Sequence, residues 1–184
     1  PKGLEEYLHS YISVLPYNEL GAAAAAYNAD EKELCRLDEI YSAAKTPFEI
    51  RSGSEKVTRR FFKICNNGQE SFTGLYKSLT EQGICKGHQC IAYGLYIRDN
   101  GIELSEGLAV YGYSICSAIV TNCVKLVPLS QLAGQKILGE SFELISSASE
   151  KALFTDINDI GISGAGFDLR AMQHERLYSR QYMS

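Results

Sequence analysis

Three side chains that could ligate a metal ion lie close together near the middle of the sequence. Cys85, His88 and Cys90 fall within six residues. Thiolates and an imidazole suit a thiophilic or borderline divalent ion such as nickel or zinc. A structural site normally needs four ligands, however, and no further Cys or His is nearby in the sequence. We therefore interpret the cysteines as packing residues, and keep a metal carrier that uses these three residues as an alternative.

The histidines do not lie in a pattern that is typical of an enzyme. His174 and Glu175 begin like the helix of a zinc protease, but Tyr178 occupies the position of the second histidine. The other two histidines, His9 and His88, have no neighbouring signature of a nucleophile with a positioned base. The sequence therefore predicts a protein that is not an enzyme and that needs no cofactor.

The composition excludes some classes of partner. The chain has 184 residues and a net charge of −4, which argues against the basic surface that nucleic-acid binding requires. Its six cysteines are scattered, as in a cytoplasmic protein with reduced thiols. Residues 107–124 carry no charge, but they include polar side chains and lack a flanking Lys/Arg cluster. We expect a central helix surrounded by other helices there, and no membrane span.

The spacing of apolar residues predicts an all-α fold, a single-domain bundle of about 8–10 helices. Thr46, Pro47 and Glu49 have the order of an N-cap, a first-turn proline and a capping-box acid. Five consecutive alanines at 22–26 would allow a close crossing with a neighbouring helix. The expected helices cover residues 4–15, 21–27, 31–44, 47–65, 70–82, 88–98, 104–127 and 132–154.

A glycine-rich segment separates the last part of the chain from this domain. Residues 161–166 contain three glycines without the lysine of a phosphate loop, so we interpret them as a hinge. Residues 168–184 have helical propensity but apolar side chains on all sides. We therefore divide the chain into a helical domain at 1–160 and a hinged tail at 161–184. The tail should order against its own body or against a partner.

Two further groups are candidates for contacts with other proteins. Arg51 and Arg59 belong to a basic helix that could dock on an acidic partner, although a solvated charged face is an equal alternative. Tyr111 and Tyr113 flank a glycine in the expected central helix. They could support a two-fold contact with another copy, and core packing is the competing interpretation.

Four blocks of sequence resemble one protein family. DLRAMQHERLYSRQYMS, at 168–184, resembles the closing motif of UreF, the urease accessory proteins, and NCVKLVPLSQLAGQKIL, at 122–138, resembles an internal segment of the same family. FEIRSGSEKVTRRF and HQCIAYGLYIRDNGI agree in order and spacing. Of the family's opening Ser-His-Gly-Leu-Glu region only Gly3, Leu4 and Glu5 remain. This departure suggests a trimmed front segment and puts functions of that segment in question.

The resemblance implies a non-catalytic helical scaffold that forms a homodimer. It would bind UreD, called UreH in some bacteria, and with it recruit the GTPase UreG to apo-urease for nickel insertion. Regulation of GTP hydrolysis by UreG, through Arg180 or Arg59, is an alternative. The implied tail contacts are Met172, Gln173, His174, Glu175, Tyr178, Ser179, Arg180 and Tyr182. The implied adjoining surface consists of Asn122, Lys125, Pro128, Gln131 and Gln135.

Overall fold

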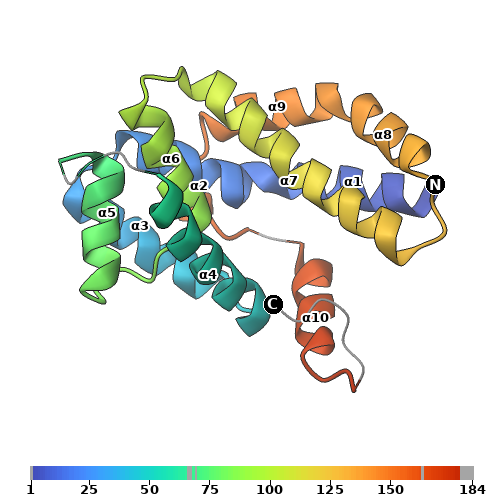
Figure 1. Ribbon diagram of the computed structural model, residues 1–184, viewed down its shortest axis with the longest axis horizontal. Helices are drawn as coiled ribbons and strands as arrows, with labels where there is room; N and C mark the ends of the chain where they lie inside the picture. Colours follow the sequence, from blue (N-terminus) through green and yellow to red (C-terminus); the bar gives the residue numbers. More distant parts are fainter. Residues whose placement is uncertain (1, 66–67, 69, 163, 179–184) are drawn as a thin grey trace.

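The computed structural model describes residues 2–65, 68, 70–162 and 164–178. These residues form α-helices and two short 3₁₀ helices and contain no β-strand, which confirms the all-α prediction. Figure 1 shows α10 at the edge of the molecule and α2 near its centre. The elements are α1 (Lys2–Val14), η1 (Leu15–Tyr17), α2 (Glu19–Asn28), α3 (Glu31–Ala44), α4 (Phe48–Ile64), α5 (Phe72–Glu81), α6 (Gln89–Asp99), α7 (Leu104–Leu126), α8 (Gln131–Glu140), α9 (Phe142–Ala152), η2 (Ile157–Asp159) and α10 (Ala165–His174).

The alanine-rich helix α2 is the centre of the packing. It contacts α3, α6, α7 and α9, and most of its residues are buried. It crosses α6 so closely that a Cβ atom added to Gly94 would lie 2.1 Å from the carbonyl oxygen of Ala23. Small side chains on both helices permit this approach, which confirms the close crossing expected from the alanine run.

The start of α4 differs from the prediction. Thr46 does not cap this helix, because its hydroxyl donates to the Ala44 carbonyl oxygen and the N-cap position is taken by Pro47. A proline side chain has no hydrogen-bonding group, so α4 has no cap of its own. The capping box of this part of the chain lies one helix earlier, where Asp30 and Glu33 bond reciprocally at the start of α3.

The expected helix at 132–154 is wrong, because the chain forms two helices that meet at Ser141. The Ser141 hydroxyl donates to the Ile137 carbonyl oxygen at 2.8 Å, and its backbone N–H donates to Leu138 at 3.1 Å. These bonds tighten the last turn of α8 and turn the chain into α9. A serine that competes for backbone groups therefore interrupts a continuous apolar pattern.

Helix α7 is the one helix of the described residues that is long and apolar enough to cross a membrane by length and composition. A core helix passes the same test, so this is weak evidence for a span. It contacts α1, α2, α6, α8 and α9, but only 33% of its apolar window is buried. The expected enclosure by other helices is thus partial, and Val110 and Tyr113 lie on an exposed face.

Gly94→Ala tests the α2–α6 crossing. The added methyl group meets backbone, which cannot move aside like a side chain, so we expect a loss of about 2 kcal/mol or more in the free energy of unfolding. Urea unfolding followed by circular dichroism measures it. Gly139→Ala, in α8 with open space around the new methyl group, is the matched control and should be neutral or slightly stabilising. Equal stability of the two variants would contradict the close crossing.

Candidate partner-binding surface

Near its start, helix α10 contacts the body of the protein through the aromatic ring of Phe167. The ring of Phe167 meets the rings of Tyr7 and Tyr11, on α1, edge-on at centroid distances of 5.4 and 5.5 Å. A groove of about 340 Å³ lies at this contact, and the Lys45–Glu19 ion pair, 2.7 Å long, lines it. No residue of α10 is fully buried. The helix therefore covers the groove without becoming part of the core.

The end of α10 is attached to the start of α4. His174 Nδ1 lies 2.6 Å from Glu49 Oε2, and Glu175 Oε1 accepts a hydrogen bond of 3.0 Å from the backbone N–H of Phe48. Glu175 thus supplies the N-terminal cap that Pro47 cannot provide. Its negative charge also lies at the positive end of the α4 dipole. Two of the implied tail contacts are therefore engaged within the chain.

Other tail side chains are accessible. Met172, Gln173 and Glu175 line a groove of about 430 Å³ beside Phe48. Tyr178 is fully exposed. The implied contacts Ser179, Arg180 and Tyr182 lie outside the described residues. The helix itself begins at Ala165 and ends at His174, so the expected helix over 168–184 is wrong at its start, and residues 175–178 are not helical.

The adjoining surface predicted on α7 and α8 is exposed. This holds for all five of its residues, Asn122, Lys125, Pro128, Gln131 and Gln135. Asn122 lines a groove of about 420 Å³ whose walls include Tyr7 and Tyr11. The same two tyrosines contact Phe167, so this groove adjoins the one under α10. The structure therefore brings the tail and the near end of the predicted α7–α8 surface into one neighbourhood.

The two arginines of α4 have partners within the fold. Arg51 donates to the carbonyl oxygens of Lys45 at 2.7 Å and Thr46 at 3.4 Å, and so holds the turn between α3 and α4. Arg59 pairs with Glu55, one helical turn away, at 3.3 Å and is exposed. Arg51 thus has a structural role that its sequence context did not indicate, whereas Arg59 stays a surface candidate.

The two tyrosines of α7 have different environments. Tyr111 is 4% exposed and stacks on Tyr93 at 4.4 Å between ring centroids. Core packing therefore describes Tyr111, and its predicted place on a dimer surface does not fit this burial. Tyr113 is exposed and meets Phe142 edge-on at 5.6 Å. Of the pair, Tyr113 stays a candidate for a contact between copies.

The predicted metal candidates do not converge on one point. The Cys85 thiol faces Cys35 at 3.9 Å, the His88 imidazole bonds Ser42 at 2.7 Å, and burial raises the pKa of the Cys90 thiol to about 12. In the part of the chain that the structure describes, no group of three or more His, Cys, Asp or Glu side chains could hold a metal ion. This geometry gives the metal-carrier alternative no support.

A buried polar network that the sequence analysis missed surrounds His88. The carboxylate of Asp38 is almost fully buried and accepts from the Tyr76 hydroxyl at 2.5 Å and from the backbone N–H groups of Lys86 and Gly87 at 2.8 and 3.1 Å. The Tyr76 hydroxyl in turn accepts from the His88 N–H at 2.8 Å. These bonds compensate the buried charge. In the sequence, Asp38 lies among the apolar residues of the face of α3 that is buried, and this position could have indicated the network.

Ser42 and His88 are residue types that form a nucleophile and its base in some enzymes, but their surroundings differ from those of a catalytic pair. His88 Nδ1 has no hydrogen-bond partner, so no acid fixes the imidazole. The imidazole is also fully buried, where a substrate cannot reach it. Its burial lowers the pKa of His88, while Asp38 and Glu55 act in the opposite direction. We interpret the pair as part of the core.

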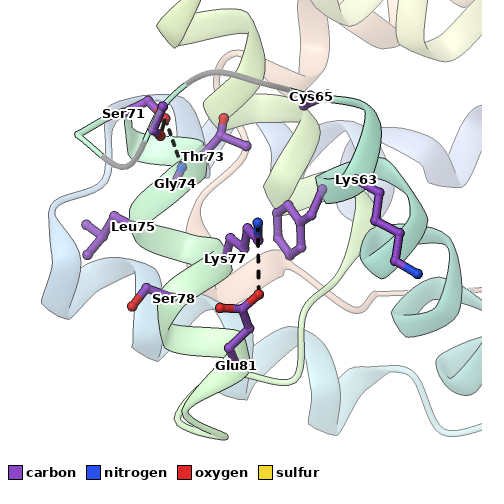
Figure 2. Close-up of a pocket in the computed structure, with 11 residues that line it drawn as sticks. Lys63, Cys65, Ser71, Thr73, Gly74, Leu75, Lys77, Ser78 and Glu81 are labelled. Atoms are coloured by element: carbon purple, nitrogen blue, oxygen red, sulfur yellow. Dashed lines mark hydrogen bonds and ion pairs between the residues drawn. The ribbon is translucent and has the colours of Figure 1, made fainter.

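A further groove, of about 660 Å³, lies between the end of α4 and α5 (Figure 2). The first backbone N–H groups of α5 are already used, because Phe72 and Thr73 donate to Asp99 and Gly74 donates to Ser71. Figure 2 also shows Lys77 directed to Glu81, and these two form an ion pair. The start of this helix is therefore poorly suited to hold a phosphate group.

His88→Gln tests the buried network through pH. Because the folded pKa of His88 is lowered, the unfolded chain binds the proton first as pH falls below about 6.5, and the fold loses stability. Between about pH 7.5 and 5.5 the free energy of unfolding should therefore fall less in the variant than in the unchanged chain. The two slopes should differ by at most about 1.4 kcal/mol per pH unit. Urea unfolding at each pH measures it. His9 and His174 are present in both proteins, so identical pH profiles would contradict a titrating His88.

The sequence is similar to one known family and to several known proteins. Residues 1–141 match the family model described as UreF. A protein of Actinobacillus pleuropneumoniae serotype 5b, named Urease accessory protein UreF, is 32% identical over 98% of this chain and 82% of its own length. Proteins of the same name from Haemophilus influenzae and Streptococcus salivarius are 32% and 28% identical over 98% and 100% of this chain, and 80% of their own length. The chain therefore belongs to the UreF family of urease accessory proteins.

Proposed function

We propose that this protein is a non-catalytic scaffold of urease maturation. In this role it binds UreD (UreH) and, together with it, recruits the GTPase UreG to apo-urease for insertion of nickel. Membership of the UreF family supports a place in urease maturation, since its relatives are named urease accessory proteins. The finer assignment of partners is our proposal, and it rests on the exposed tail and the surface beside it.

The observation that carries the proposal is the loose attachment of α10. The contacts of the helix with the body include those of Phe167 and His174 and, directly after the helix, of Glu175, and none of its residues is fully buried. Leu169, Leu177 and Tyr178 stay exposed. Exposed apolar residues beside polar ones are typical of surfaces that bind other proteins. Such a helix is suited to take part in an interface at small cost to the core.

The roles within the tail follow from this attachment. His174 and Glu175 already bond α4, so they orient the segment. Tyr178 and Met172 are free to supply apolar contact area, which aromatic residues and methionine do at the dry centre of interfaces. The exposed residues of α7 and α8 extend the surface beyond the groove that Asn122 shares with Tyr7 and Tyr11.

Tyr178→Ala tests the proposed anchor. Because Tyr178 is fully exposed, its loss should leave the free energy of unfolding unchanged while weakening binding to UreD more than tenfold, a change of about 2 kcal/mol. Titration of immobilised UreD with the purified chain measures the dissociation constant.

Phe154→Ala is the matched control, since this side chain is also aromatic and strongly exposed but lies outside the tail. It should bind UreD as the unchanged chain does. Deletion of residues 168–184 should abolish capture of UreD and UreG together. Unaltered capture by the deletion variant would refute the assignment of the tail.

We also propose that the protein forms a homodimer through the exposed face of α7. Tyr113 and Val110 lie on this face, and Phe142 of α9 meets Tyr113. All three side chains are exposed and apolar or aromatic. A two-fold axis beside them would bury the same patch on both copies.

Tyr113→Asp tests the dimer. In a two-fold contact the new aspartates of the two copies face each other, and their like charges repel. The variant should therefore be a folded monomer, whereas the unchanged chain is a dimer. Light scattering gives the mass and circular dichroism the fold. Ile64→Asp, at an exposed apolar position at the end of α4, is the control and should stay dimeric. A dimeric Tyr113→Asp protein would place the interface elsewhere.

The cytoplasm is the proposed compartment. All six cysteines are free thiols, as expected in reducing surroundings. No cofactor is proposed, and the Ser42–His88 pair lacks the setting of a catalytic base, which supports a role without chemistry.

A further inference from the structure

Two cysteines that are 50 positions apart in the sequence face one another. The Sγ atoms of Cys35, on α3, and Cys85, in the turn after α5, lie 3.9 Å apart. Both are free thiols. In a disulfide the sulfur atoms are about 2 Å apart. Rotation of the two side chains can bring the sulfur atoms this close where the backbone positions are compatible.

The backbone on both sides of this pair is already held together. Asp38, one turn after Cys35, accepts hydrogen bonds from the N–H groups of Lys86 and Gly87, which directly follow Cys85. The N–H of Cys85 itself donates to the Leu79 carbonyl oxygen at 3.2 Å. These hydrogen bonds hold the two backbone segments next to each other and so keep the two thiols close. A bond between the thiols therefore requires little movement of the chain.

The two thiols differ in their access to solvent. Cys85 is 2% exposed, whereas Cys35 is only partly buried. Burial, with the nearby Asp38 and Cys35, raises the pKa of the Cys85 thiol well above its usual range. A reagent in solution therefore meets Cys35 first, and Cys85 is placed to react with the product.

We propose that Cys35 and Cys85 form an oxidation-sensitive pair that a small-molecule disulfide, such as oxidised glutathione, converts into a disulfide between α3 and the turn after α5. This inference is independent of the proposed function. The oxidant of this site is a soluble disulfide, and Cys35 is the residue that reacts with it first.

The reaction has two exchange steps. The Cys35 thiolate attacks one sulfur of oxidised glutathione, a mixed disulfide forms, and the first glutathione leaves as a thiolate that takes up the proton of Cys35. Cys85 then loses its proton and attacks Cys35 Sγ as the thiolate, the mixed disulfide breaks, and the second glutathione leaves as a thiolate that takes up this proton. The two cysteine thiols lose two electrons, and one oxidised glutathione becomes two reduced molecules.

The closed pair would constrain the chain between the two cysteines. A disulfide removes conformations from the unfolded chain, so the oxidised protein should melt at a higher temperature than the reduced one. The bond would also fix the segment that carries the Asp38 hydrogen bonds, directly before His88 and α6. Oxidation would then stiffen the junction between α3 and the turn after α5.

The test treats the folded full chain with oxidised glutathione, unfolds it in guanidinium chloride and alkylates the remaining thiols with iodoacetamide. The number of alkylated cysteines should fall from six to four, and peptide mapping should find Cys35 linked to Cys85. Dithiothreitol should restore all six. A link between other cysteines, or no link in the folded protein, would overturn the proposal.

Variants identify the order of the steps. Cys85→Ser should stop at a stable mixed disulfide on Cys35, and Cys35→Ser should leave Cys85 unmodified in the folded state. Cys123→Ser, at a partly buried position on α7, is the matched control and should still form the Cys35–Cys85 link. Circular dichroism checks each fold, and Cys85→Ala replaces Cys85→Ser if the hydroxyl is not tolerated. Rapid modification of Cys85 in folded Cys35→Ser would contradict Cys35 as the entry point.

Discussion

The close crossing of α2 and α6 is the contact on which the arrangement of the other helices depends. At Gly94 the backbone of α6 approaches the Ala23 carbonyl oxygen so closely that no side chain fits between them. Helix α2 then contacts α3, α7 and α9 with its remaining faces, and the bundle gathers around it (Figure 1). The alanines have little side-chain entropy to lose, so this centre is built from backbone proximity more than from large apolar side chains.

A second constraint is the buried charge of Asp38. Its three hydrogen bonds join α3 to Tyr76 on α5 and to the turn that leads into α6. Removal of any one donor would leave part of a buried carboxylate without compensation, which is costly in a medium of low polarity. The network therefore specifies how three helices meet, and it also explains why the cysteines beside it are neighbours. The bonds of His174 and Glu175 to α4, by contrast, lie at the surface, and no residue of α10 is fully buried.

The sequence predicted the class of fold because that class follows from repeated local patterns. The helices at 31–44 and 104–127 were found nearly to the residue, since their apolar spacing and their ends agree. Thr46 was misjudged because a short hydroxyl side chain can cap a helix or bond a nearby carbonyl oxygen, and only the neighbouring backbone decides between them. The break at Ser141 was missed because the apolar pattern continues through it. Asp38, Tyr111 and Arg51 depend on which helices meet, and spacing alone does not contain that information.

The carboxylate of Glu175 makes the order of α4 dependent on the position of α10. If a binding protein draws this segment away, the Phe48 amide loses its acceptor, and the first turn of α4 loses about 1 kcal/mol of stabilisation. Linkage requires the reverse as well, so any ligand that brings its own carboxylate to that amide lowers the free energy of releasing the segment. Binding at the start of α4 and binding at the segment after α10 would in this way affect each other through one backbone donor, the N–H of Phe48.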